Sequence, residues 1–235
     1  MEFTFGIITS GNNFDDLSKI ITSIKNQHIK NYEIIIVGGE NAFELEEVVI
    51  HYPFDDTLKN GWITKKKNII TSKAKYENIV FMHDYIILHK NWYKGFLKFG
   101  NDFEIAMNKI YNKDNKRLRD WCLWTDNGNF VDNIVNPKLR CLLPYNVENL
   151  NEFMYISGTY WVAKRKLMEE NPLNENLLWG QGEDVEWSKR VRNIYSFKMN
   201  KHSKVLSLKQ KRNDFRLISK KDLVTINNKM LNISE

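Results

Sequence analysis

Two adjacent carboxylates in a glycine-containing segment are the residues whose types and spacing best suit chemistry. Segment 179–184 reads Trp-Gly-Gln-Gly-Glu-Asp. Gly180 lets the backbone turn tightly beside a ligand, and Trp179 offers a flat apolar face to a sugar ring. Glu183 and Asp184 stand where a helix begins, and one positioned carboxylate can take the proton of an attacking hydroxyl group. The helix dipole also favours acids in a first turn, so an ordinary helix start explains the same pair.

A further carboxylate, Asp84, follows an apolar run and could bind a divalent metal that bridges a diphosphate. Mg²⁺ and Mn²⁺ prefer carboxylate oxygen and neutralise a departing diphosphate. His202 could be a nitrogen ligand of the same metal, with Met199 as a weak thioether neighbour. A turn residue at Asp84 and an exposed histidine at His202 are the alternatives. The lysines of 65–67 could neutralise phosphates or form a solvated helix face, and Glu40 could bind a base or ribose or belong to a turn.

The first part of the chain alternates continuous apolar runs with helical periodicity, which is typical of an α/β protein. The predicted strands cover 3–9, 32–37, 48–50 and 77–82, and the predicted helices cover 14 to about 27 and 62–74. In open α/β sheets, ligands bind beyond the carboxyl ends of the strands. We therefore expect Thr9-Ser10, Gly39-Glu40 and His83-Asp84 at the rim of one site.

The pattern is less regular between residues 100 and 150, which we interpret as an insertion over the site. A strand is predicted over 153–163, a short helix over 164–170 and another helix over 184–192. The segment 198–221 holds nine Lys or Arg residues and a single acid. It could be a solvated surface, a lid that orders over a bound donor, or a contact with an anionic membrane.

The composition of the 235 residues, 42% of them hydrophobic, fits a chain that folds alone. There is no apolar run of about 18 residues and no basic-then-apolar N-terminal signal, so we expect a cytoplasmic protein, peripheral at a membrane at most. Cys122 and Cys141 have no CxxC spacing and are expected to be ordinary thiols. The formal net charge of +6 suits an anionic partner, but no nucleic-acid motif is present, so no nucleic acid is expected.

The first 90 residues resemble the nucleotide-binding half of the inverting family 2 glycosyltransferases, which have the GT-A fold. In that family one strand ends in a Thr-rich loop, a second ends in acids near the base, a helix carries an Arg-Asn pair, and a further strand ends in an Asp-x-Asp metal motif. The similar positions here are Thr9, Ser10, Glu40, Lys67-Asn68 and Asp84. The second aspartate of the metal motif is absent, because the sequence after Asp84 is Tyr-Ile.

Residues 157–203 more closely resemble the family that includes the animal beta-1,4-galactosyltransferases. Its Gly-Trp-Gly-Gly-Glu-Asp segment is similar to 179–184, and its Met-x-x-His metal ligands are similar to Met199 and His202. The resemblance implies that the aspartate after the Glu, Asp184, is the catalytic base with Glu183 beside it.

Together the resemblances imply a single α/β domain with the GT-A fold, in which helices flank a Rossmann-like, mostly parallel central sheet. Residues 1–98 would bind the nucleotide sugar, residues 99–205 would bind the acceptor, and residues 206–235 would form a basic tail. The implied activity is inverting transfer of a sugar, from a UDP-sugar first of all, to a glycan or lipid-linked acceptor, with Mn²⁺ or Mg²⁺ as cofactor. The implied donor contacts are Thr9, Ser10, Glu40, Lys67, Asp84, Trp179 and Gly180.

Three other functions fit parts of the sequence. The missing second aspartate suits a catalytically inactive sugar-binding relative, and the basic segment suits a nucleic-acid-binding protein. A nucleotidyltransferase of the same broad fold should carry a Gly-rich loop with a basic residue directly after its first strand. Residues 9–13 hold only Gly11 and no Lys or Arg, which argues against that activity.

Overall fold

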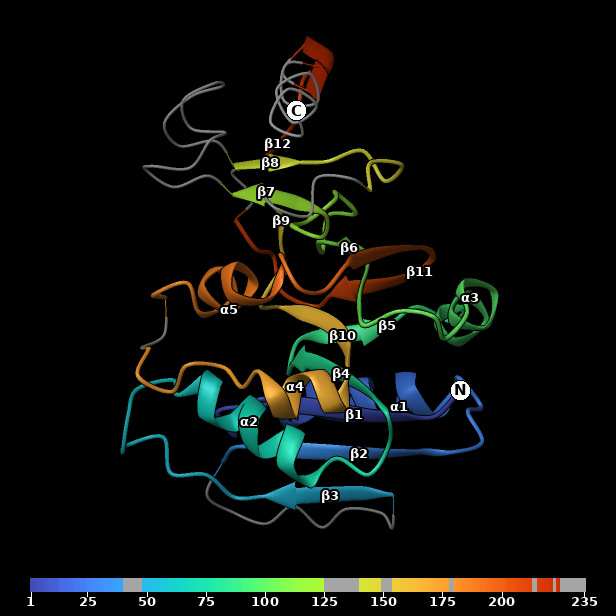
Figure 1. Cartoon of the computed structure of the whole chain (residues 1–235). Coiled ribbons are helices and arrows are strands. Elements are labelled where there is room, and N and C mark those ends of the chain that lie inside the picture. Colours follow the sequence, from blue (N-terminus) through green and yellow to red (C-terminus); the bar gives the residue numbers. More distant parts are fainter. Residues whose placement is uncertain are drawn as a thin grey trace.

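Eight strands form the main sheet of the computed structural model, in the order β3-β2-β1-β4-β10-β6-β11-β5 (Figure 1). The structure describes residues 1–39, 48–124, 140–148, 154–177, 180–212, 215–221 and 223–224. The strands are β1 (Phe3–Ile8), β2 (Tyr32–Val37), β3 (Val49–Tyr52), β4 (Asn78–His83), β5 (Ile86–Leu88), β6 (Ile105–Tyr111), β10 (Tyr160–Lys164) and β11 (Phe197–Ser207). Only β10 and β5 run antiparallel to their neighbours in this sheet. The sheet is therefore mostly parallel, as the sequence pattern predicts.

The pairing register brings the ends of the first parallel strands to one level. Ile8 of β1 lies opposite both Val37 of β2 and His83 of β4. The Thr9 backbone N–H donates to the Val37 carbonyl, and the Asp84 N–H donates to the Ile8 carbonyl, each at 3.1 Å. Because parallel strands end at a common edge, the loops that begin with Thr9 and Asp84 meet there.

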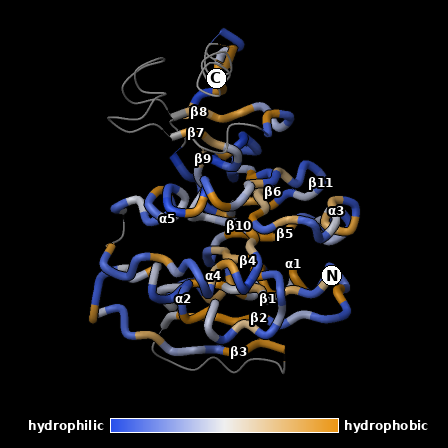
Figure 2. Tube along the Cα trace, viewed as in Figure 1, coloured by the Kyte–Doolittle hydropathy of each residue, from blue (hydrophilic) through white to orange (hydrophobic). Residues whose placement is uncertain are grey.

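Hydrophobic residues concentrate on the central strands, whereas many loop residues are hydrophilic (Figure 2). β1, β2 and β4 are buried along nearly their whole length, which is why each reads as a continuous apolar run. Gly6 of β1 lets α2 (Ile63–Lys73) approach closely, because an added Cβ would lie 2.3 Å from Cγ2 of Ile70. This close contact fixes the position of α2 over the sheet.

Helices lie on both faces of the sheet. α1 (Phe14–Lys25) connects β1 to β2 and α2 connects β3 to β4, in opposite directions along the strand order, so right-handed crossovers place them on opposite faces. α2 packs against α4 (Arg165–Glu170) in front of the sheet, and α3 (Trp92–Phe99) packs against β11 (Figure 1). α5 (Glu183–Val191) contacts the short strand β9 (Met154–Tyr155), which belongs to a second, smaller sheet. None of the helices among the described residues has the length and apolar character needed to cross a bilayer.

A smaller sheet has the order β12-β8-β7-β9 and lies beyond β6 and β11 in Figure 1. Its strands are β7 (Cys122–Trp124), β8 (Arg140–Leu142), β9 (Met154–Tyr155) and β12 (Arg216–Leu217). The prediction of one strand over 153–163 is wrong, because residues 156–159 separate β9 from β10 and the two strands join different sheets. The interpretation of residues 100–150 as an insertion over the site is also wrong in part, since β6 lies between β10 and β11 in the main sheet.

The basic segment 198–221 begins as a strand of the main sheet rather than as a solvated tract. Along β11 buried residues such as Met199 and Val205 are interspersed with lysines that point outward. The lysines conceal the strand pattern in the sequence because they raise its polarity, and β11 pairs with β6 on both sides of an irregularity between Asn200 and Lys204. After β11 the chain returns to the end of β4, where the Leu208 backbone N–H donates to the Tyr85 carbonyl at 2.8 Å.

Candidate functional site

A pocket of about 380 Å³ opens where β1 and β4 end. Four segments surround it: the loop after β1, the turn after β4, the start of α2 with its preceding loop, and the chain just after β11. The residues relevant to chemistry are Thr9, Ser10, Asn13, Lys66, Asp84 and Lys209. The structure thus brings together three of the predicted donor contacts and adds two lysines and an asparagine.

Asp84 is buried in this pocket and is oriented by the loop after β1. Its Oδ2 atom accepts hydrogen bonds from Thr9 Oγ1 at 2.8 Å and from Asn13 Nδ2 at 3.3 Å. Thr9 Oγ1 in turn accepts a hydrogen bond from the Gly11 backbone N–H at 3.0 Å. The carboxylate therefore fixes the loop conformation as much as the loop fixes the carboxylate.

Lys66 is the lysine of α2 that faces the pocket. Its Nζ atom donates to the Thr9 carbonyl at 2.6 Å and lies 2.7 Å from Asp56 Oδ1. Gly38, with a φ of 131°, makes room for this contact, because an added Cβ would lie 1.8 Å from the Thr9 carbonyl oxygen and 3.1 Å from Lys66 Nζ. The sequence predicts a donor contact for Lys67, but successive helix residues point about 100° apart, and the structure turns Lys66 to this side.

Lys67 is fully buried on the inner side of α2, beside the second carboxylate site. Its Nζ atom donates to the Gly158 carbonyl at 3.0 Å, lies 3.8 Å from Glu183 Oε1 and lies 4.5 Å from the Trp161 ring centroid. Burial lowers the pKa of Lys67 because the ammonium group loses its water, and the charges of Glu183 and Asp184 oppose this shift. Lys67 is therefore a counter-ion of this carboxylate pair.

Asp184 stands in the first turn of α5 and is held by two backbone donors. Its Oδ2 atom accepts the Gly158 N–H at 2.8 Å, and its Oδ1 atom accepts the Val185 N–H at 2.9 Å. An added Cβ at position 158 would lie 2.7 Å from Glu183 Oε1 and 3.0 Å from Asp184 Oδ2, so any residue larger than glycine would displace these carboxylates. The two carboxylates and the loop backbone thus form one close-packed unit.

The pKa of Asp184 is raised from 3.8 to about 6. Desolvation by burial is the largest cause, and repulsion by the Glu183 carboxylate adds to it. The hydrogen bonds from Gly158 and Val185 and the charge of Lys67 act in the opposite direction without cancelling the shift. The acid at this helix start is thus a stronger base than an exposed aspartate, although the helix dipole favours its charged form.

The loop 157–159 joins the pocket to Asp184. The His83 backbone N–H donates to the Thr159 carbonyl at 3.3 Å, and the Thr159 side chain hydrogen-bonds to Tyr85. Burial raises the pKa of Tyr85 to about 12, and burial together with nearby lysine charges holds the pKa of His83 well below its usual value. Both side chains are therefore neutral at pH 7, and a single short loop separates the pocket from the raised-pKa carboxylate.

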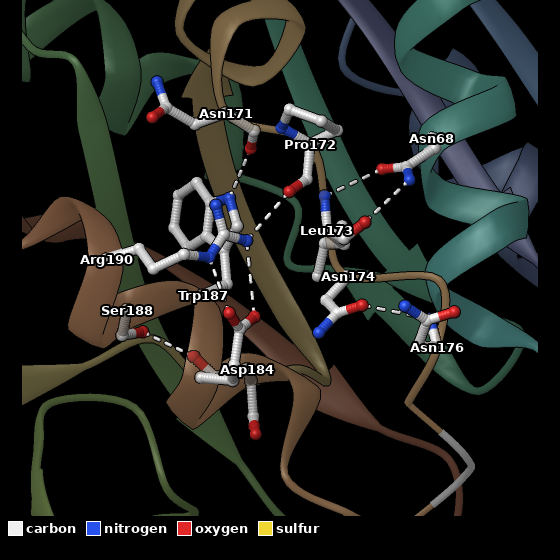
Figure 3. A network of polar contacts seen from close by, with 11 residues as sticks. Asn68, Asn171, Pro172, Leu173, Asn174, Asn176, Asp184, Trp187, Ser188 and Arg190 are labelled. Carbon is white, nitrogen blue, oxygen red and sulfur yellow. Dashed lines mark hydrogen bonds and ion pairs between the residues drawn. The ribbon is translucent and has the colours of Figure 1, made fainter.

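A polar network anchors α5 and with it Asp184 (Figure 3). Trp187 Nε1 and Arg190 Nη2 donate to carbonyl oxygens of the segment 171–173, at 2.6 and 2.8 Å. Asn68 of α2 holds the same segment from the other side, with Nδ2 donating to the Leu173 carbonyl at 2.9 Å and Oδ1 accepting the Leu173 N–H at 3.0 Å. The helix that carries Asp184 is thereby fixed to α2, the helix that carries Lys66 and Lys67.

The side chains around Asp84 do not fit a bound divalent cation. Mg²⁺ and Mn²⁺ take several oxygen ligands, in nucleotide sites usually one or two carboxylates together with substrate phosphates and waters. In the part of the chain that the structure describes, no group of three or more His, Cys, Asp and Glu side chains could hold a metal ion. Lys209 lines the same pocket as Asp84. The charge of Asp84 raises the pKa of Lys211, so Lys211 also lies near this carboxylate. Cationic groups therefore surround Asp84.

His202 and Met199 are not brought to Asp84. Asp84 lies just before β5, whereas the His202 backbone packs against α3 beyond the far end of that strand, where a Cβ added to Gly95 would lie 2.5 Å from the His202 carbonyl oxygen. Burial and three nearby lysines lower the pKa of His202. Met199 is buried opposite Met107 of β6. The three predicted metal ligands therefore do not form one cluster.

The remaining predicted contacts are described only in part. Glu40 and Trp179 lie outside the described residues. Gly180 is exposed with a φ of 80°, which a residue with a side chain rarely adopts. Sequence reasoning did not single out Asn13 or Gly158 as site residues. The sequence signal for Gly158 is its place in the Ser-Gly-Thr loop 157–159 just before a strand. A glycine there permits close approach of another backbone or side chain.

No protein-family model and no curated protein matches the chain. Among solved structures, S. aureus TarS 1-349 aligns with a TM-score of 0.58 and 12% identity over 95% of this chain and 62% of that one. GalNAc-T7, in complex with UDP, GalNAc and Mn²⁺, aligns with a TM-score of 0.64 and 14% identity over 90% of this chain and 44% of that one. The chain thus spans less than two thirds of the length of either neighbour.

At these identities the likeness concerns the fold alone. The large mixed sheet and the helices on its faces match the two GT-A glycosyltransferase structures. The chain therefore has the α/β GT-A fold.

Proposed function

We propose that the protein is an inverting glycosyltransferase that moves a sugar from a nucleotide-sugar donor, with UDP-sugars as the first candidates, to a hydroxyl group of a glycan or lipid-linked acceptor. The observation that carries this proposal is the Asp184 carboxylate, whose pKa of about 6 suits a general base and which one short loop joins to the pocket at the strand ends. The fold supports the proposal by analogy, since GalNAc-T7 binds UDP and GalNAc.

In the proposed reaction the acceptor hydroxyl group attacks the anomeric carbon of the donor sugar. A bond forms between the acceptor oxygen and this carbon, while the bond from the carbon to the diphosphate oxygen breaks. Its electron pair leaves with the nucleoside diphosphate, and Asp184 takes the hydroxyl proton. A single displacement of this kind inverts the configuration at the anomeric carbon.

Other residues position the reacting groups in this proposal. Glu183 raises the pKa of Asp184 by repulsion and lies beside Lys67. On the donor side Thr9 and Ser10 shape the pocket together with Asp84, while Glu40 contacts the base or ribose. Trp179 and Gly180 contact the sugar from the segment that leads into α5.

The test is a panel of nucleotide sugars in which released nucleoside diphosphate and sugar transfer are both measured. We expect Asp184→Asn to lower turnover by roughly 10²- to 10⁴-fold with donor binding retained, which is the usual contribution of general-base catalysis. Glu186→Gln is the matched control, since Glu186 lies on the same helix in an exposed ion pair with Arg190 at 2.6 Å. It should keep turnover within about twofold, as exposed ion pairs contribute little.

Two results would count against the proposal in different ways. A wild-type protein that binds no nucleotide sugar contradicts the function as a whole. A wild-type protein that binds a donor and never releases the diphosphate, with or without acceptors, indicates the inactive sugar-binding alternative. Full turnover by Asp184→Asn removes the assigned role of this residue only.

A further inference from the structure

The segment that follows β11 carries two lysines to the C-terminal end of β4. Lys209 lines the same pocket as Asp84, and its Nζ atom lies 5.4 Å from the Tyr85 ring centroid. Lys211 Nζ lies 4.0 Å from the same centroid and near enough to Asp84 for that carboxylate to raise its pKa. Both ammonium groups therefore lie at the ring of Tyr85, the residue after Asp84, and Lys209 also lines the pocket itself.

The backbone of this segment is fixed by buried side chains, so the position of the lysines is built into the fold. Ser207 Oγ donates to the Lys209 carbonyl at 2.7 Å. The buried Asn112 side chain holds Lys211 on both sides, donating to its carbonyl at 2.6 Å and accepting its N–H at 2.8 Å. Pairing of β11 with β5 sets the register of the whole segment.

The charge around Asp84 is unbalanced in favour of cations. Lys66 already pairs with Asp56, at 2.7 Å. Lys209 and Lys211 have no carboxylate within ion-pair distance among the residues that the structure describes. Burial lowers the pKa of Lys211, and the positive charges of Lys209 and Arg119 lower it further because they repel its ammonium group. With Lys66 and Asp56 paired to each other, Lys209 and Lys211 stand beside Asp84, and their two positive charges are suited to an anion with more than one negative charge.

We infer that Lys209 and Lys211 neutralise the diphosphate of the donor in place of a divalent metal ion. This inference rests on the proposed function and concerns the same pocket. The diphosphate would lie between the start of α2 and the segment after β11, with the lysine N–H groups donating to phosphate oxygens. The same two side chains would stabilise the charge that the nucleoside diphosphate carries as it leaves.

The experiment is calorimetric titration of the 235-residue chain with UDP and with uridine, in buffer that contains EDTA and in buffer that contains Mn²⁺. The variants are Lys209→Ala/Lys211→Ala, Lys209→Arg/Lys211→Arg and the control Lys198→Ala/Lys201→Ala. The control removes the same charge from β11, at lysines whose ion-pair partners are exposed acids, Asp102 and Glu148. Thermal unfolding of each variant shows whether it is folded.

We expect UDP affinity to be the same in EDTA and in Mn²⁺. The double alanine variant should lose roughly 100-fold or more in UDP affinity, as two charge-assisted hydrogen bonds are removed, without any change in uridine affinity. The double arginine variant should keep most of the UDP affinity, and the control should stay within about twofold of wild type.

Three results would overturn the inference. UDP binding that requires Mn²⁺ and is equal in wild type and in the double alanine variant assigns the neutralising role to a metal. Equal losses of UDP and uridine affinity in a folded double alanine variant show that the lysines shape the pocket rather than hold the phosphates. Absence of UDP binding to wild type in both buffers overturns the proposed function itself, and this inference with it.

Discussion

Replacing Asp184 by Asn should change the pH dependence of stability as well as the activity. The pKa of Asp184 is about 6 in the folded protein against 3.8 for a free aspartate, so the folded state binds more protons than the unfolded state between these pH values. Stability from this group is therefore present below about pH 4 and is lost as the pH rises to about 6. The burial that makes Asp184 a suitable base thus destabilises the fold at neutral pH.

The size of the effect follows from the shift. A difference of about 2 pKa units corresponds to about 3 kcal/mol of unfolding free energy, since each unit is about 1.4 kcal/mol. Asn cannot ionise, and it also loses one of the two hydrogen bonds from the Gly158 and Val185 N–H groups. That loss is nearly independent of pH, so the comparison of variant with wild type isolates the titration.

The assay is thermal or urea unfolding of wild type, Asp184→Asn and the control Glu186→Gln at several pH values between 4 and 7. Relative to wild type, Asp184→Asn should gain about 2 to 3 kcal/mol of stability as the pH rises through this range, or roughly 4 to 12 °C in Tm. Glu186→Gln should show a change below about 1 kcal/mol, as expected for an exposed ion pair. A difference between Asp184→Asn and wild type that stays constant with pH would refute the raised pKa and the reasoning built on it.

Three further predictions test the packing around the site. Gly158→Ala should lower the free energy of unfolding by about 1 to 3 kcal/mol and abolish turnover, because its Cβ would press on both carboxylates; an unchanged Tm and full activity would contradict this close contact. Lys67→Met should destabilise the protein by about 3 to 5 kcal/mol by leaving Glu183 without its counter-ion, and adding Glu183→Gln should recover most of this loss in a double-mutant cycle. Thr9→Val should weaken UDP binding, measured by calorimetry, by roughly tenfold, because the Asp84 carboxylate loses its 2.8 Å donor, whereas Thr57→Val in an exposed turn should leave it unchanged.

Much of the fold could be predicted from the sequence because burial determines its pattern. The continuous apolar runs at 3–9, 32–37 and 77–82 correspond to β1, β2 and β4, which are covered on both faces. The positions after two of those runs, Thr9 and Asp84, share one pocket because strand direction alone sends them to the same edge. In β11, lysines alternate with buried residues and dilute the apolar pattern, so the sequence does not indicate a strand there.

The sequence by itself determined that Asp184 stands at the start of a helix and that the loops after two strands, at Thr9-Ser10 and His83-Asp84, meet at one edge of a sheet. Only the tertiary structure decided the chemistry of those residues. The pKa of Asp184 depends on burial and on Lys67, which is 117 positions away in the chain, and helix rotation decides that Lys66 rather than Lys67 faces the pocket. The same holds for Lys209, which reaches Asp84 because β11 pairs with β5. Local periodicity records which residues are buried, whereas electrostatics depends on distances between segments that the chain order does not specify.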